Sequence, residues 1–256
     1  RSRSLVFRLE RQLRYVLPSV ILAVGILWGM VSFGVPAMAT YVARVLPADA
    51  LDSLGESTLV ALDQFVFEPT TLAPVRQREV RSLISEKFAA AETDGYEVVF
   101  RGGGDLGANA VALPDGTIVL TDELLHLLVS DEEIVSVCAH EIGHVVGRHS
   151  MRQILQAASV TALSYFLISD ATETVQELLS VAPGILISSS FSREFEREAD
   201  SHAVALLQRA GVSVNHLATA LQRLSESSAA DEGPAYLASH PATDERIDAI
   251  RATLQH

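Results

Sequence analysis

The chain has 256 residues, 48% of them hydrophobic, and its 19 basic and 32 acidic side chains give a formal net charge of −13. This length and apolar content can bury a large core, which excludes a disordered protein, and the acidic balance argues against a nucleic-acid partner because phosphate contacts need clustered Lys and Arg. The single cysteine, Cys138, excludes an intrachain disulfide and a cysteine-based structural zinc site.

The N-terminal segment predicts a membrane anchor. Residues 1–14 hold five arginines and one acid, and residues 15–43 carry no charged side chain. A helix needs roughly 20 apolar residues to cross the hydrocarbon core of a bilayer, so the uncharged run is long enough. We therefore predict a basic cytoplasmic flank over residues 1–14 and a transmembrane helix over residues 15–43 that contacts the lipid bilayer.

A buried core helix and a cleavable signal peptide are the alternatives to an anchor, and Ala37-Met38-Ala39 resembles a cleavage site. The uncharged run is longer than either alternative usually shows. Arginine-rich flanks stay in the cytoplasm, and residues 45–75 carry five acids and no base. We expect a single-pass protein of a bacterial inner membrane, with the main domain on the non-cytoplasmic, periplasmic side.

The rest of the chain predicts a mainly helical α+β domain. Residues 44–75 contain three prolines and are interpreted as a connector, which leaves residues 76–256 for the main domain. A Ser-x-x-Glu capping box over residues 130–133 predicts a helix that continues to about Arg148. Residues 154–168 are apolar with polar interruptions, which favours a core helix or one lying at the membrane interface. Other helices are predicted over residues 76–93, 193–210, 214–224 and 243–254, and short strands over residues 96–101 and 117–121.

The sequence His140-Glu141-Ile142-Gly143-His144 lies inside the helix that the capping box begins. His140 and His144 are spaced i, i+4, so they project from one helical face and can hold one zinc ion. Glu141 points to the neighbouring side, where it can accept a proton from a water activated by the metal. This H-E-x-x-H pattern also arises by chance, and both histidines then have an ordinary explanation as core or surface residues.

A catalytic zinc ion needs a third protein ligand and an open fourth position. The metzincin pattern requires a histidine at position 150, which is Ser150 here, and His149 is on the wrong face of a continuous helix. The stretch 192–200 offers three glutamates instead. Glu196 and Asp200 share a helical face, so Glu196 can bind the metal while Asp200 accepts the ring N–H of a ligand histidine.

Three separated motifs give the chain a specific resemblance. They are H-E-x-x-H, the pattern S-R-x-x-E-x-x-A-D over residues 192–200, and S-H-P followed by E-R-I over residues 239–247. In this order and spacing they resemble zinc metallopeptidase family forty-eight, a gluzincin group that includes HtpX-type, Oma-type and CAAX-prenyl endoproteases. The resemblance covers about residues 76–251, and a single-span, membrane-anchored bacterial member fits it best.

The resemblance implies a zincin fold with a small β-sheet beside the cleft. It makes Glu196 the third ligand, His240 an oxyanion-stabilising group and Arg246 a residue that orients this region. Asn109 and Ala110 resemble the family's strand beside the cleft, where a substrate would bind in an extended conformation through main-chain pairing. The other two glutamates of residues 194–198 lack the family spacing and are expected on the solvated helix face.

We therefore expect a metalloendopeptidase with one zinc ion per chain, which hydrolyses peptide bonds of misfolded or membrane-associated proteins in protein quality control. Two alternatives remain. One is a non-catalytic zinc-containing chaperone or adaptor of the same fold. The other is a protease that processes prenylated proteins, although one membrane span cannot build the enclosed chamber of such enzymes. His149 is expected to be structural, and Cys138 a small buried hydrophobe.

Overall fold

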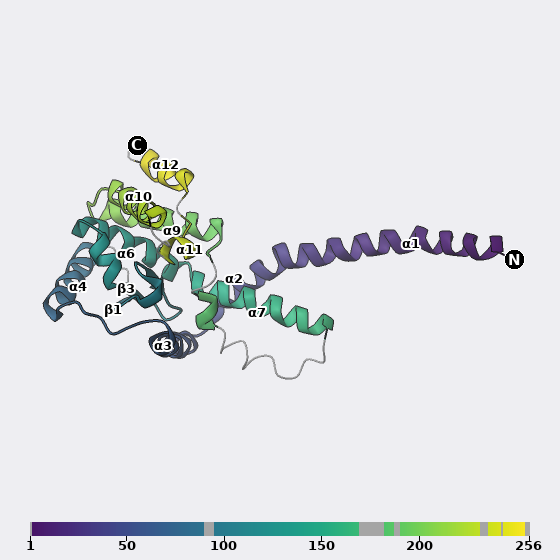
Figure 1. The fold of residues 1–256 in the computed structure, drawn as a ribbon, viewed down its shortest axis with the longest axis horizontal. Coiled ribbons are helices and arrows are strands. Elements are labelled where there is room, and N and C mark those ends of the chain that lie inside the picture. Colours follow the sequence, from purple (N-terminus) through teal and green to yellow (C-terminus); the bar gives the residue numbers. More distant parts are fainter. Residues whose placement is uncertain are drawn as a thin grey trace.

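The computed structural model describes residues 2–89, 95–168, 182–186, 190–230, 235–241 and 243–253. A mainly helical domain is built around a small β-sheet, and a long helix extends from it toward the N terminus (Figure 1). The α+β, mainly helical fold class predicted from the sequence is confirmed.

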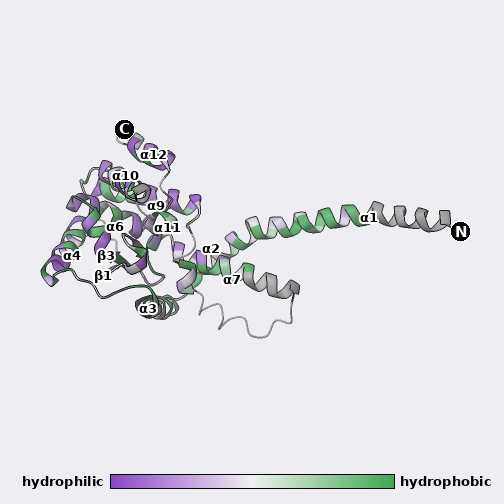
Figure 2. Ribbon diagram, viewed as in Figure 1, coloured by the Kyte–Doolittle hydropathy of each residue, from purple (hydrophilic) through white to green (hydrophobic). Residues whose placement is uncertain are grey.

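The N-terminal extension is helical in three successive parts: α1 (Ser2–Gly29), the π-helical segment η1 (Met30–Gly34) and α2 (Val35–Val45). Within the described residues, Tyr15–Val45 is the one stretch long and apolar enough to cross a membrane. It is predominantly hydrophobic (Figure 2), and most of its side chains are exposed, Ile21 to 70%. This exposure excludes the buried core helix considered above and leaves a membrane anchor or a signal sequence.

The end of α2 is attached to the domain. The helix packs against α7 (His149–Ile168), and Ala43 near its end is fully buried. Arg148 has a positive φ of 50°, and its Nη1 atom donates to the carbonyl oxygens of Ala43 at 2.5 Å and Leu46 at 3.4 Å. These bonds satisfy carbonyls that a helix end leaves without a partner, so the apolar helix is fixed to the turn before α7.

The segment 44–75 is more than the connector predicted from the sequence, because it contains the helix α3 (Ala48–Phe65). The buried face of α3 includes Leu51, Leu54 and Leu62, which join a hydrophobic cluster with residues of the sheet and of α7. The prolines that suggested a connector lie just outside this helix or at the start of the next one. The helix is therefore packed onto the domain.

The sheet has three short strands in the order β1-β3-β2, with β1 parallel and β2 antiparallel to β3. Their bounds are β1 (Glu97–Arg101), β2 (Ala110–Ala112) and β3 (Thr117–Thr121). The strand β2, at one edge of the sheet, also contacts a central helix, α6 (Asp131–Val146). This contact places the sheet edge beside the helix that carries H-E-x-x-H.

The central helix begins at the predicted cap. The Ser130 hydroxyl accepts the N–H of Glu133 at 3.2 Å, and the Glu133 carboxylate accepts the N–H of Val129 at 2.8 Å, one residue before the cap. Around α6 the main hydrophobic core gathers residues of the sheet and of several helices. The other named helices are α4 (Pro74–Phe88), η3 (Gly104–Leu106), α5 (Asp122–Leu127), α9 (Arg193–Arg209), α10 (Asn215–Ala230), α11 (Ala235–Ser239) and α12 (Asp244–Ala252).

Candidate active site

The close contact between α6 and α9 forms the site. A Cβ atom added to Gly143 would lie 2.7 Å from the carbonyl oxygen of Ala199, so only glycine lets the two backbones approach this closely. Ser192 caps α9 by accepting the N–H of Phe195 at 3.2 Å, which fixes where this helix starts. The resulting register brings Glu196 against the histidine pair of α6.

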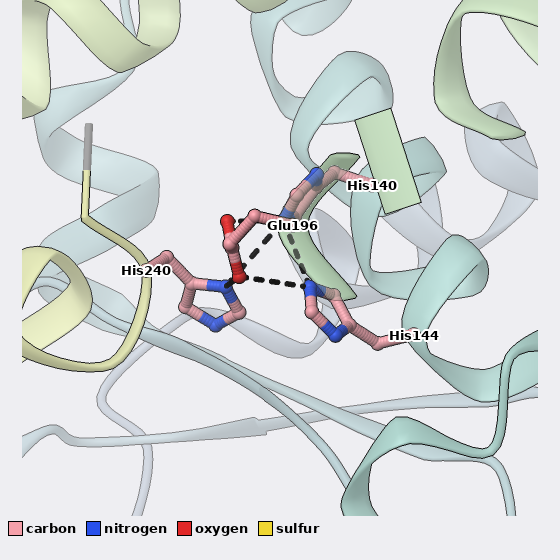
Figure 3. A group of neighbouring side chains, drawn as sticks. All are labelled: His140, His144, Glu196 and His240. Atoms are coloured by element: carbon pink, nitrogen blue, oxygen red, sulfur yellow. Dashed lines mark hydrogen bonds and ion pairs between the residues drawn. The ribbon is translucent and has the colours of Figure 1, made fainter. Parts of the chain in front are cut away.

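Figure 3 shows the two histidines of α6 and the carboxylate of α9 pointing toward one another. Nε2 of His140 lies 3.0 Å from Nε2 of His144. The Glu196 oxygens lie 3.6 Å from the first of these nitrogens and 3.4 Å from the second. Ligands at the usual zinc distances, in a tetrahedron, are about 3.3 Å apart. The three side chains are 0–2% exposed and have the spacing that one small cation requires.

His240 lies in the same cluster. Its Nδ1 atom is 3.0 Å from Glu196 Oε1 and 3.4 Å from His140 Nε2, and its ring stacks on Tyr236 with the ring centroids 4.5 Å apart. One ligand atom from each of His140, His144, Glu196 and His240 lies within 4.8 Å of the others. The family resemblance implied an oxyanion-stabilising role for His240, whereas this geometry also makes it a possible fourth metal ligand.

A buried ion-pair network lies next to the cluster. The Arg246 guanidinium donates two bonds of 2.8 Å to the Asp200 carboxylate and also contacts Glu196. Oδ1 of Asp200 lies 2.9 Å from Nδ1 of His140, the ring nitrogen that faces away from the cluster. Both residues that the sequence analysis assigned to positioning roles therefore contact a candidate ligand directly.

The charges of the cluster suit a cation. Burial raises the pKa of Glu196, but the neighbouring His240 and His144 lower it more, so the carboxylate is ionised. Burial lowers the pKa of His144 well below its ordinary value, which keeps this imidazole neutral and able to bind a metal. Burial opposes ionisation of Asp200 as well, and the bonds from Arg246 outweigh it, so the pKa of Asp200 is lowered.

Glu141 lies on the neighbouring side of α6 and is completely buried. Its Oε1 atom accepts a bond of 3.4 Å from the Tyr236 hydroxyl and lies 3.9 Å from Nε2 of His240. Its Oε2 atom has no hydrogen-bond partner among the residues that the structure describes. A buried carboxylate oxygen without a partner is rare, and here it leaves Glu141 with a free hydrogen-bond acceptor. Burial raises the pKa of Tyr236, which keeps the phenol protonated as a donor.

The other residues singled out from the sequence are not among the candidate ligands that the described part of the chain brings together. Ala110 begins the edge strand β2, and Asn109 immediately precedes it. The Asn109 main chain pairs with Thr121, and its side-chain Oδ1 has no partner among the described residues. Cys138 is fully buried in the core of α6, as predicted.

Two contacts near the cluster have no signal in the sequence. Tyr236 precedes His240 by one helical turn, and no motif marks it. His149 is structural and Glu198 is exposed, both as expected, but the contact between them and the packing of His149 behind His144 were not predicted. Glu198 follows Glu196 at i+2, a spacing that put it on another face of α9 and hid this contact.

A cavity of about 630 Å³ borders the cluster between α9 and α12. Its lining reaches Glu196, Asp200 and Arg246, and it includes the apolar side chains of Phe191 and Ile250. The cluster of candidate metal ligands is thus next to a space that can accommodate a side chain of another molecule.

Two imidazoles one turn apart, an adjacent glutamate and a carboxylate from a second helix are the components of a zincin-type metallopeptidase. Comparison with known proteins agrees. Residues 72–254 match peptidase family M48, and the chain belongs to this family. The family resemblance, the gluzincin fold and the metalloendopeptidase class predicted from the sequence are thereby confirmed.

Three relatives illustrate the range of similarity. The chain is 33% identical over 142 residues to the mitochondrial metalloendopeptidase OMA1 of Arabidopsis thaliana, an alignment covering 54% of this chain and 28% of that protein. It is 30% identical over 151 residues to the beta-barrel assembly-enhancing protease of Escherichia coli, covering 54% and 31%. It is 26% identical over 228 residues to metalloprotease LoiP of Escherichia coli, covering 87% and 86%. The chain therefore spans about a third or less of the first two relatives and most of the third.

Proposed function

We propose that this protein is a zinc-dependent endopeptidase whose metal is held by His140, His144 and Glu196. The observation that carries the proposal is the distance of 3.0–3.6 Å between their ligand atoms, in a site that is 0–2% exposed. Two imidazoles and one carboxylate form a donor set that zinc accepts in catalytic sites. Because the pKa of Glu196 is lowered, its carboxylate is ionised and supplies the negative charge that a cation needs.

The surrounding side chains suit peptide hydrolysis. A bound zinc ion would acidify a water molecule and polarise a peptide carbonyl. Glu141, through its unpartnered Oε2, takes a proton from the attacking water and passes it to the leaving amine. The Tyr236 hydroxyl holds the other carboxylate oxygen in place. His240, when it does not bind the metal, can donate to the developing oxyanion, an interaction commonly worth about 3–4 kcal/mol.

The substrates we propose are protein segments in an extended conformation. Main-chain bonds of β2 to β3 use Asn109 and Leu113, so the alternate main-chain groups at Ala110 point away from β3, on an edge strand that is buried in the structure. If substrate binding uncovers this edge, a substrate strand can pair with it by main-chain bonds. The N-terminal helix, acting as an anchor, would keep the peptidase near membrane-associated and misfolded proteins, which favours a role in protein quality control.

The second candidate is a non-catalytic chaperone or adaptor with a closed metal site. It is favoured by the position of His240, because a fourth protein ligand would occupy the position that water needs. This candidate predicts tight zinc binding without peptide hydrolysis.

Zinc removal tests the proposed function. Protein purified in detergent is expected to bind one zinc ion per chain and to cleave unfolded casein. Exhaustive chelation should abolish the cleavage, and stoichiometric zinc should restore it, whereas magnesium should not, because it prefers oxygen ligands in an octahedral arrangement. Zinc content is measured by atomic absorption and cleavage by gel densitometry. Cleavage that survives complete metal loss would rule out the zinc mechanism.

For location, we propose that the protein is an inner-membrane protein with its peptidase domain on the periplasmic side. The basic flank before Tyr15 and the acidic, base-free residues 45–75 support this orientation. A periplasm-dependent phosphatase fused after Arg44 is expected to be active in a bacterial host, and the same fusion after Arg14 to be inactive. The reverse pattern would reverse the orientation. Release of the mature domain from washed membranes would indicate a cleaved signal peptide.

A further inference from the structure

His149 lies directly behind the candidate ligand His144. Its Nδ1 atom is 3.0 Å from Nδ1 of His144, the ring nitrogen that faces away from the metal cluster. On the other side of the ring, Nε2 lies 3.1 Å from Oε2 of Glu198. The imidazole therefore bridges a ligand histidine and a carboxylate of the neighbouring helix.

A break in the helix makes this position possible. On a continuous helix, five residues would place His149 about 140° away from His144. In the structure α6 ends at Val146, and Arg148 adopts a positive φ of 50° before α7 begins. The chain turns at this point and folds the ring of His149 back toward α6.

The pocket around the ring is built to hold it. His149 is completely buried, and its imidazole stacks on the Phe195 ring with centroids 4.5 Å apart and an interplanar angle of 2°. A Cβ atom on Gly147 would overlap the imidazole, so glycine leaves the space that the ring occupies. Arg152 donates to the same Glu198 oxygen at 2.9 Å, which fixes the carboxylate in turn.

Only one arrangement of protons satisfies every contact when a metal is bound. Nε2 of His144 faces the cluster and must be free of a proton to bind a cation, so Nδ1 carries the hydrogen. That N–H then donates to Nδ1 of His149. The hydrogen of His149 consequently lies on Nε2 and donates to Glu198. Glu198, His149 and His144 form one directed chain of hydrogen bonds.

We propose that His149 is a positioning residue that orients His144 and fixes its tautomer for metal binding, with Glu198 and Arg152 as its support. The inference deepens the proposed function and rests on it, because it concerns a ligand of the zinc ion. His140 has a carboxylate, Asp200, at its rear nitrogen, whereas His144 is supported by a second imidazole. Such partners typically change metal affinity by 10–100-fold when removed.

The test measures the zinc dissociation constant by chelator competition, together with the visible absorption spectrum of the Co²⁺-substituted protein. His149→Phe keeps the stacking on Phe195 and removes both hydrogen bonds. It is expected to raise the dissociation constant by about 10–100-fold and to alter the Co²⁺ spectrum. His149→Asn should restore part of the affinity, because its side-chain oxygen can lie near the Nδ1 position and accept from His144.

Two further variants test the chain of hydrogen bonds without removing the imidazole of His149. Gly147→Ala displaces the ring, and Glu198→Ala removes its carboxylate partner, so both are expected to weaken zinc binding. Glu194→Ala, on the exposed part of the same helix, is the matched control and should leave it unchanged. Thermal melts of the zinc-free proteins identify any variant that fails to fold. If one of His149→Phe, Gly147→Ala and Glu198→Ala does not fold, the remaining two decide the outcome.

The outcomes separate the inference from the proposed function. If the wild type binds no zinc, the proposed function fails and this inference fails with it. If the wild type binds zinc normally and the folded His149→Phe, Gly147→Ala and Glu198→Ala proteins bind it equally well, the positioning role alone is wrong. Loss of affinity in these variants, with partial recovery in His149→Asn, supports it.

Discussion

Replacing Glu141 by Gln is expected to reduce kcat for casein cleavage by about 10²–10⁴-fold while one zinc ion stays bound per chain. Glutamine keeps the size of the side chain and can still accept the bond from the Tyr236 hydroxyl. It cannot take a proton from water at neutral pH. Since Glu141 is absent from the group of candidate metal ligands, the loss should appear in kcat and not in zinc content.

The measurement is a steady-state assay with a quenched-fluorescent peptide, with zinc content determined on the same samples. Glu132→Gln is the matched control, because Glu132 lies in the first turn of the same helix and is exposed. Its kcat should equal that of the wild type. If Glu141→Gln hydrolyses the peptide at the wild-type rate, another residue is the general base.

The same comparison separates the two candidate functions. If wild type and Glu141→Gln are equally inert while each binds one zinc ion, the closed-site chaperone or adaptor is favoured. His240→Ala then becomes informative, because removal of a fourth ligand would open a position for water. Peptidase activity that appears only in this variant would identify His240 as an inhibitory fourth ligand in a site that is otherwise able to hydrolyse peptides.

The features predicted from the sequence are those that local patterns determine. The Ser130 cap, the i, i+4 histidines and the start of α9 at Ser192 depend on residues within one or two helical turns. Glu196 and Asp200 followed from spacing on one helix together with the family motifs. Their contacts with His140 then required only that the two helices pack together, which Gly143 permits.

The features that were missed depend on contacts between distant segments or on a local break in a helix. Extending α6 through Arg148 put His149 on the wrong face, because a positive φ at an arginine has no sequence signal. Tyr236 contacts Glu141 across 95 positions. The helix α3 was hidden by flanking prolines, and its role became visible only when its leucines packed against the sheet.

Replacing Arg246 by Leu is expected to destabilise the metal-free protein by about 3–5 kcal/mol. Arg246 is 8% exposed and binds Asp200 through two nitrogens while contacting Glu196. Without it, two buried carboxylates would lie beside each other without their cation. One of the two carboxylates would then take up a proton or move, and either change would also disturb the cluster of candidate metal ligands. Arg246→Lys should restore little, because an ammonium group cannot form the same two parallel bonds.

Thermal melting of the zinc-free protein in detergent measures this effect, and the midpoint should fall by about 6–20 °C. Arg251→Leu is the matched control, because Arg251 lies on the same helix, is exposed and bonds only to the Gln222 side chain among the contacts described. Zinc binding should recover part of the lost stability in Arg246→Leu, since the cation partly neutralises Glu196. A midpoint equal to that of Arg251→Leu would mean that water or a shifted side chain compensates both carboxylates, and that Arg246 does not position the third ligand.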